Sequence, residues 1–202
     1  MSNFSCLLNL IFYLNLIKIQ STPIINLYYE TLCPYCGQFI TTQLKSLIDK
    51  GNMANVVVNL IPYGIVNETF NITTGLYDYE CHHGPNECEG NIMSGCFIDI
   101  LGRVNSYKYL ICLENLVKRY KGNFTKTLEM CTKDNNNLFK LITECATGKR
   151  GNEIMHENGA KTPQLPYTPY ITLNGWHMTN DETLMMNNLY DFLCSNYKDV
   201  CK

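Results

Sequence analysis

The feature that most restricts the fold is a pair of cysteines one helical turn apart, placed between a strand pattern and a helix pattern. Residues 27–39 read LYYETLCPYCGQF, and the segment 24–30 (IINLYYE) is rich in the β-branched and aromatic residues typical of a strand. Residues 56–61 (VVVNLI) predict a second strand that Pro62 ends. Between them, apolar residues recur at steps of three and four, which predicts an amphipathic helix ending at Gly51. Those apolar residues are Phe39, Ile40, Leu44, Leu47 and Ile48. The pattern predicts a parallel strand–helix–strand unit.

The middle of the chain has a different pattern. From about 65 to 160 we expect helices and no strands, with the clearest helical periodicity at 91–101, 107–120 and 136–146. Residues 170–173 (YITL) predict a strand, and Asn174-Gly175 is a strong type I′ hairpin signal leading into residues 176–178. A last helix is expected at 180–194. The order βαβ, helical insertion, ββα resembles the thioredoxin-like fold, an α/β fold with the CxxC pair at the start of its first helix.

The first residues have the character of a secretory leader. The stretch LLNLIFYLNLI at 7–17 is shorter than the roughly 20 apolar residues that span a bilayer, and small or polar residues follow it. We therefore favour a cleaved signal peptide at 1–21 over a membrane anchor. A single domain with a helical insertion at about 65–160 is expected to occupy 22–202. No other stretch is long and apolar enough to enter a membrane, so no membrane contact is expected after cleavage.

Cysteine usage points to an oxidising compartment. The chain has 11 cysteines, of which Cys6 lies in the leader and two form the CPYC pair. The remaining even number in a secreted chain predicts four structural disulfides whose connectivity the sequence leaves open, since eight cysteines allow 105 pairings. Three glycosylation sequons agree with the secretory route, at Asn67, Asn71 and Asn123. The cysteines assigned to disulfides are Cys81, Cys88, Cys96, Cys112, Cys131, Cys145, Cys194 and Cys201.

Charge and composition exclude several classes of partner. The formal net charge is −2, which gives no electrostatic basis for binding nucleic acid or an anionic membrane. Hydrophobic residues at 46% and aromatic residues at 11% argue against a disordered chain.

The CPYC pair carries the chemistry of a thiol exchanger. A thiolate is the nucleophile that attacks a disulfide, and a helix N-terminus stabilises that negative charge. Cys33 is expected at that N-terminus as the nucleophile, and Cys36 one turn later as the cysteine that resolves the mixed disulfide. Pro34 suits the first turn because its missing N–H costs nothing there. The alternative is an inert bridge or half of a zinc site, but the CxxC pattern occurs once in the chain.

A second segment belongs to the same expected site. Residues 162–169 (TPQLPYTP) precede the YITL strand, where thioredoxin-like proteins carry a cis-proline that faces the CxxC pair and shapes the substrate groove. Pro169 occupies that place, with Thr168 before it. We expect this proline to be cis, although a trans proline at a strand start is the commoner state. The predicted groove residues are Pro34, Tyr35, Thr168 and Pro169.

Residues 81–96 read CHHGPNECEGNIMSGC, which raises the alternatives of a metal site and disulfides. The cysteine spacings of six and then seven intervening residues lack the tight pairs of structural zinc sites, so disulfides are favoured and no metal is assigned. Here the sequence resembles the gamma-interferon-inducible lysosomal thiol reductases, whose signature is C-Q-H-G-x-x-E-C-x-x-N-x-x-x-x-C. His82 stands in place of the glutamine. The resemblance extends to LYYETLCPYC, to LIPYG at 60–64 and to TPYITLNG at 168–175. The signature matches are Cys81, His83, Gly84, Glu87, Cys88, Asn91 and Cys96.

The resemblance implies a thioredoxin-like, glycosylated enzyme that reduces disulfides of unfolded protein substrates at acidic pH. It assigns catalysis to Cys33 and Cys36. The enzyme that it implies needs no cofactor, only an external small thiol reductant. His83 and Glu87 either hold their segment against the active site or cap helices, while His82 is expected to be solvated. The enzyme would act in the secretory pathway, in a lysosome or acidic vesicle, or after secretion.

Two other functions remain as alternatives. One is a secretory-pathway disulfide oxidase or isomerase, related to glutaredoxins through the CPYC motif, which a redox potential well above that of glutathione would indicate. The other is a secreted, disulfide-rich binding protein without catalysis, against which the intact CxxC pair argues.

Overall fold

The computed structural model describes residues 22–201, so the predicted signal peptide and Cys6 lie outside the described residues. In this part of the chain, no helix combines the length and apolar character needed to cross a bilayer.

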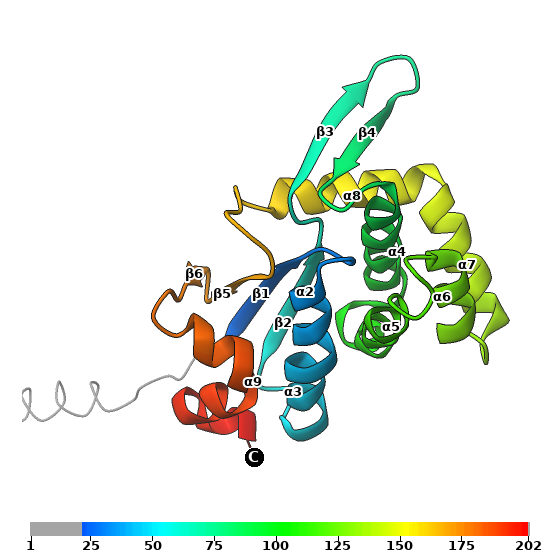
Figure 1. Ribbon diagram of the computed structural model, residues 1–202. Coiled ribbons are helices and arrows are strands. Elements are labelled where there is room, and N and C mark those ends of the chain that lie inside the picture. Colours follow the sequence, from blue (N-terminus) through cyan, green and yellow to red (C-terminus); the bar gives the residue numbers. More distant parts are fainter. Residues whose placement is uncertain (1–21, 202) are drawn as a thin grey trace, which may run out of the picture.

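A four-stranded sheet in the order β2-β1-β5-β6 organises the fold. Its strands are β1 (Ile24–Tyr29), β2 (Val57–Pro62), β5 (Tyr170–Leu173) and β6 (Trp176–His177). β1 pairs in parallel with β2, whereas β5 is antiparallel to β1 and β6 is antiparallel to β5. Asn174 and Gly175 both have positive φ, at 53° and 86°, which confirms the predicted hairpin turn. The order βαβ…ββα predicted from the sequence is confirmed (Figure 1).

The crossover between β1 and β2 is one helical segment that begins at the CPYC pair. It consists of α2 (Pro34–Phe39), a π-helical turn (Ile40–Leu44) and α3 (Lys45–Lys50). The hydroxyl groups of Thr41 and Thr42 donate hydrogen bonds to the carbonyls of Gly37 and Gln38 at 2.7 Å, at the point where the helix widens.

Five helices lie between Cys81 and β5. The sequence predicts the core of three of them correctly, although the first begins earlier than expected, at Pro85, and the second ends earlier, at Leu116. The sequence does not predict the other two. The helix at 124–131 is short, and the helix at 149–161 has few apolar residues in a mostly polar sequence. The helices are α4 (Pro85–Leu101), α5 (Arg103–Leu116), α6 (Phe124–Cys131), α7 (Asn136–Thr147) and α8 (Lys149–Lys161).

The expectation that residues 65–160 contain no strands was wrong. β3 (Val66–Asn71) and β4 (Leu76–Cys81) form an antiparallel hairpin that projects from one end of the molecule (Figure 1). Its side chains are mostly exposed or half-buried, so the alternation of buried and exposed residues that marks a strand is weak. Cross-strand contacts replace burial, such as Phe70 against Tyr77 with ring centroids 5.2 Å apart.

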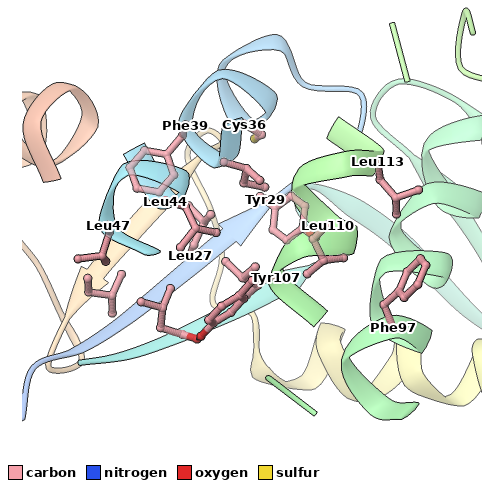
Figure 2. Close-up of a cluster of buried hydrophobic side chains, with 14 of the residues drawn as sticks. Leu27, Tyr29, Cys36, Phe39, Leu44, Leu47, Phe97, Tyr107, Leu110 and Leu113 are labelled. Carbon is pink, nitrogen blue, oxygen red and sulfur yellow. The ribbon is translucent and has the colours of Figure 1, made fainter. Parts of the chain in front are cut away.

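The hydrophobic core lies between the sheet and the surrounding helices. Figure 2 shows Leu27 and Tyr29 of β1 between the helical segment that follows CPYC and α5. The Tyr107 hydroxyl of α5 donates a 2.6 Å hydrogen bond to the Val58 carbonyl of β2, which fixes α5 against the sheet. The helix that contributes Leu110 and Leu113 to this core is therefore held beside the CPYC segment.

The C-terminal end packs on the crossover helix. The helix expected at 180–194 is present as α9 (Glu182–Asn196), shifted by two residues at each end. A 3₁₀ turn (Lys198–Cys201) follows it. α9 contacts the π-helical turn and α3.

Within residues 22–201, four disulfides join the cysteines outside the CPYC pair. Three of them tie helices α4 to α7 to one another or to the hairpin, and the fourth closes the C-terminal end. The pairs are Cys81–Cys88, Cys96–Cys145, Cys112–Cys131 and Cys194–Cys201.

Candidate active site

Cys33 stands at the junction of β1 and α2. It is the N-cap residue of α2, with extended backbone angles (φ −67°, ψ 121°), and Pro34 occupies the first turn of the helix. The Gly37 N–H donates to the Cys33 carbonyl at 3.1 Å, closing that turn. Strand, turn and helix are consecutive in sequence, so local propensities alone place this sulfur where helix N–H groups converge.

The surroundings of Cys33 favour its thiolate. Two features favour the thiol instead: the Cys33 thiol is placed to donate to the Thr168 carbonyl oxygen at 3.7 Å, and the residue is only 6% exposed. A hydrogen bond from the Cys36 thiol lowers the pKa of Cys33 from 9.0 to about 6, helped by the Cys36 and Tyr35 N–H groups and by Thr168, while burial opposes the shift. Cys33 therefore loses its proton at a lower pH than an ordinary thiol.

Cys36 behaves in the opposite way. It is fully buried, and its Sγ accepts a 3.5 Å contact from the Glu30 N–H. Burial raises the pKa of Cys36 well above 9.0, and the hydrogen bond and charge of Cys33 raise it further. In the described part of the chain, Cys33 and Cys36 are the cysteines outside disulfides. The pair thus holds one acidic thiol and one that keeps its proton.

The loop before β5 faces this pair. The Thr168–Pro169 peptide bond is cis, as predicted. Pro169 is buried, whereas Pro34 and Tyr35 are exposed, Tyr35 at 67%. The structure therefore brings Thr168 next to Cys33 and leaves Tyr35 in solvent at the rim of the same site.

A buried carboxylate that the sequence reasoning missed lies beneath this loop. The Glu30 side chain is 0% exposed, and its Oε2 accepts a 2.9 Å hydrogen bond from the Thr168 hydroxyl. Its Oε1 accepts a 2.8 Å bond from the Ile65 N–H. Gly64 has φ 76°, and a Cβ at this position would lie 2.0 Å from the Glu30 Cγ, so the chain needs glycine there. The signal in the sequence that could have identified Glu30 is a charged residue at the end of an apolar strand.

The segment CHHGPNEC converges on Glu30. Glu87 is completely buried in the first turn of α4, where it accepts hydrogen bonds from the His83 N–H at 3.2 Å and lies 2.5 Å from His83 Nδ1. Burial, followed by the charge of Glu30, raises the pKa of the Glu87 carboxyl. His82 is 55% exposed, as the expectation of a solvated side chain requires, yet its Nδ1 lies 3.5 Å from Glu30 Oε2. Of the two uses left open, the contacts favour the first: Glu87 binds the N–H and the ring of His83 in the turn before α4, and His83 approaches the buried carboxylate of Glu30, whereas α4 has no side-chain cap hydrogen bond.

Asn91 supports the same region from α4. Its Oδ1 accepts a 3.1 Å hydrogen bond from the Thr31 N–H, and its Nδ2 donates a 3.0 Å bond to the Tyr63 carbonyl. One buried amide therefore ties the turn before CPYC to the end of β2, which gives the signature asparagine a structural role.

A second missed carboxylate, Glu114 of α5, lies on the other side of the pair. It is 6% exposed, and a Cβ on Gly37 would lie 3.1 Å from its Oε2. Burial raises the pKa of the Glu114 carboxyl well above 4.5, and the Cys33 charge adds to this. Glu114, Cys33 and His83 line one pocket of about 530 Å³, together with Lys118. Nothing near Glu114 in the sequence marks it, because it meets Cys33 only through helix packing.

The three sequons occupy different settings. Asn67 is exposed on β3, and Asn71 is half-buried at the turn of the hairpin, where its side chain accepts from the Thr73 N–H. Asn123 is exposed and caps α6 by accepting a 2.8 Å hydrogen bond from the Lys126 N–H. Glycosylation at these positions stays a prediction.

Comparison of the sequence with protein families gives one match that covers more than half of the chain. The sequence model described as gamma interferon inducible lysosomal thiol reductase matches residues 24–135. A gamma-interferon-inducible lysosomal thiol reductase from Carassius auratus is 32% identical over 189 residues, covering 90% of this chain and 71% of that protein. The protein of the same name from Mus musculus is 30% identical over 197 residues, covering 90% and 73%.

Solved structures give the same fold. The oxidoreductase DsbA from Xylella fastidiosa superposes with a TM-score of 0.54 at 14% sequence identity, covering 88% of this chain and 87% of that one. At this identity the likeness concerns the fold, and it confirms the thioredoxin-like class predicted from the element order.

Proposed function

The chain belongs to the gamma-interferon-inducible lysosomal thiol reductase family, and on that premise we propose that its Cys33 and Cys36 reduce disulfide bonds of protein substrates through a mixed-disulfide intermediate. The family and the fold make the chain a thiol–disulfide oxidoreductase. The observation that carries the assignment to these residues is the contrast between an acidic Cys33 and a buried Cys36 that keeps its proton.

In the first step, the Cys33 thiolate attacks one sulfur of the substrate disulfide. The substrate S–S bond breaks, a Cys33–substrate disulfide forms, and the second substrate sulfur leaves as a thiolate that takes up a proton. With a pKa of about 6, about 3% of Cys33 is thiolate at pH 4.5, compared with about 0.003% for a pKa of 9.0. This gain of about 1,000-fold outweighs an intrinsic loss of nucleophilicity of about 15- to 30-fold. The lowered pKa therefore supports action at acidic pH.

In the second step, Cys36 resolves the intermediate. Burial still raises the pKa of Cys36 at this stage, but the negative charge of Cys33 that raised it further disappears when Cys33 becomes part of the mixed disulfide, so Cys36 loses its proton more easily than before. Its thiolate attacks the Cys33 sulfur, a Cys33–Cys36 disulfide forms, and the second substrate thiolate leaves. The substrate has gained two electrons and two protons, and the enzyme has lost them.

The cycle closes when two equivalents of a small thiol reductant return these electrons and are oxidised to their own disulfide. The pair needs no further cofactor for this chemistry. The exposed Pro34 and Tyr35 and the Thr168–Pro169 loop border the nucleophile, and we assign the substrate groove to them.

An acidic compartment of the secretory pathway is the proposed place of action. Both relatives described above carry the word lysosomal in their names, and the predicted leader and sequons agree with this route. Disulfide-containing proteins that are unfolding in such a compartment are the proposed substrates.

The test is reduction of insulin disulfides by the purified protein at pH 4.5 and pH 7, with dithiothreitol as the donor. Cys33→Ser should abolish activity at both pH values, and Cys36→Ser should trap a mixed disulfide visible on a non-reducing gel. A double variant Cys194→Ser/Cys201→Ser serves as the control for loss of cysteines in general, and it should remain active. Undiminished activity in Cys33→Ser refutes the assignment, and activity confined to pH 7 refutes the acidic compartment.

A further inference from the structure

We propose that His82, His83 and Glu30 form a binding site for a divalent transition-metal ion of the Zn²⁺ type, beside the CPYC pair and without participation of its sulfurs. The three side chains each offer one ligand atom, and these atoms all lie within 4.8 Å of one another. They come from the end of β1 and from the turn between β4 and α4, which are distant in sequence.

The distances fit a tetrahedral cation better than direct hydrogen bonds. Glu30 Oε2 lies 3.5 Å from His82 Nδ1 and 3.4 Å from His83 Nδ1. Strong N–H···O bonds measure about 2.7–3.2 Å, so both contacts are long. Ligands at about 2.0–2.1 Å from a tetrahedral Zn²⁺ stand about 3.3–3.4 Å apart. Two edges of the cluster therefore already have the length that a shared cation requires.

The carboxylate of the site is fixed before any cation arrives. Glu30 is 0% exposed, its Oε2 accepts from the Thr168 hydroxyl at 2.9 Å, and its Oε1 accepts from the Ile65 N–H at 2.8 Å. Such outer hydrogen bonds orient metal ligands and contribute strongly to affinity. Glu87, also buried, lies 2.5 Å from His83 Nδ1, so a cation that binds this nitrogen replaces the hydrogen bond between them, and this second buried carboxylate adds negative charge beside the ion.

Charge at the site favours a cation. Glu30 and Glu87 are both fully buried, and within residues 22–201 neither carboxylate forms an ion pair with lysine or arginine. The basic side chains within 3.5 Å of them are the two histidines, which are 55% and 34% exposed, so an ion has a route from solvent. Two imidazoles with one carboxylate and an open position are a ligand set that suits zinc.

One ligand of the proposed site is absent from the family signature. His82 stands where the family signature carries glutamine, so the second imidazole comes from the one departure in the motif. The neighbouring cysteines do not compete as ligands, because Cys81 is bonded to Cys88. That disulfide instead fixes the turn on which both histidines lie.

Isothermal titration of Zn²⁺ into the purified protein at pH 7.5 tests the proposal. The protein carries Cys33→Ser and Cys36→Ser, so that the active-site thiols cannot bind the metal, and its four disulfides are intact. We expect saturable binding of one ion per chain. His82→Gln, which restores the signature residue at an exposed position, should weaken the affinity at least about tenfold, since it removes a direct ligand.

The matched control is His156→Gln. His156 also bonds a glutamate, with its Nδ1 3.0 Å from Glu68 Oε1, but it lies on α8 outside the cluster. Its replacement should leave the affinity unchanged. Absence of saturable one-to-one binding, an unchanged affinity in His82→Gln, or equal weakening by both variants would overturn the proposal. Because the thiols are absent from every protein compared, these outcomes do not depend on whether the CPYC pair is catalytic.

Discussion

The acidity of Cys33 depends first on the thiol of Cys36, so Cys36→Ala should raise the pKa of Cys33. The Cys36 thiol is the largest of the groups that lower this pKa from 9.0 to about 6, and alanine removes it while leaving the backbone N–H donors in place. A hydrogen bond to a charged group contributes about 1.5–3 kcal/mol, which corresponds to about one to two pH units. A rise of one unit would reduce the thiolate fraction at pH 6 from about 50% to about 10%.

The assay is the rate at which iodoacetamide alkylates Cys33 as a function of pH, with the midpoint giving the pKa. At pH 5 the thiolate fraction falls about ninefold for a one-unit rise, while each thiolate becomes about 2.5- to 3-fold more nucleophilic, so the rate should fall about 3- to 4-fold. Cys36→Ser keeps an O–H donor at the same position and should shift the midpoint less than alanine does. A midpoint that stays near 6 in Cys36→Ala would refute the assignment of the lowered pKa to the partner thiol.

Two further predictions concern stability. Burial raises the pKa of Glu114 well above 4.5, so the folded protein keeps a proton that the unfolded chain loses, and the stability is complete below pH 4.5 and falls as the pH rises above it. Glu114→Gln should remove that loss, so urea denaturation should show the variant gaining stability relative to the parent between pH 4.5 and pH 7; a constant difference would contradict this reasoning. Removing the Cys96–Cys145 disulfide, with a sequence separation of 49, should cost about 4 kcal/mol of unfolding free energy, against about 2.5 kcal/mol for Cys81–Cys88, with a separation of 7. Equal losses in denaturant titrations would show that loop entropy is not the controlling quantity.

The predictable part of the site is the part that is local in sequence. Strand β1, the turn and α2 are consecutive, and the period of apolar residues changes from strand-like to helical across the CPYC pair. Cys33 is therefore placed at a helix N-terminus by local propensity, and its reactivity could be expected before the structure was known. The Asn174-Gly175 turn was predictable for the same reason, because its positive φ angles depend on two adjacent residues.

The missed elements lacked a local apolar period. β3 and β4 are stabilised mainly by pairing with each other, and their side chains are mostly exposed or half-buried. Helix α8 buries few residues, among them Ile154 and Met155, on a largely polar sequence. Tertiary and cross-strand contacts stabilise β3, β4 and α8, and the pattern of a few adjacent residues does not reveal such contacts.

The sequence by itself determined the fold class, the thiol pair and the family, because each depends on residue types at fixed short spacings. Only the tertiary structure decided which charged groups surround the thiols. Glu30 and Glu87 meet because the turn between β4 and α4 folds onto the end of β1, and Glu114 reaches Gly37 because α5 packs against the CPYC segment. Burial then sets the pKa directions of Glu87 and Glu114, and burial is a property of the packed chain that no single segment of the sequence possesses.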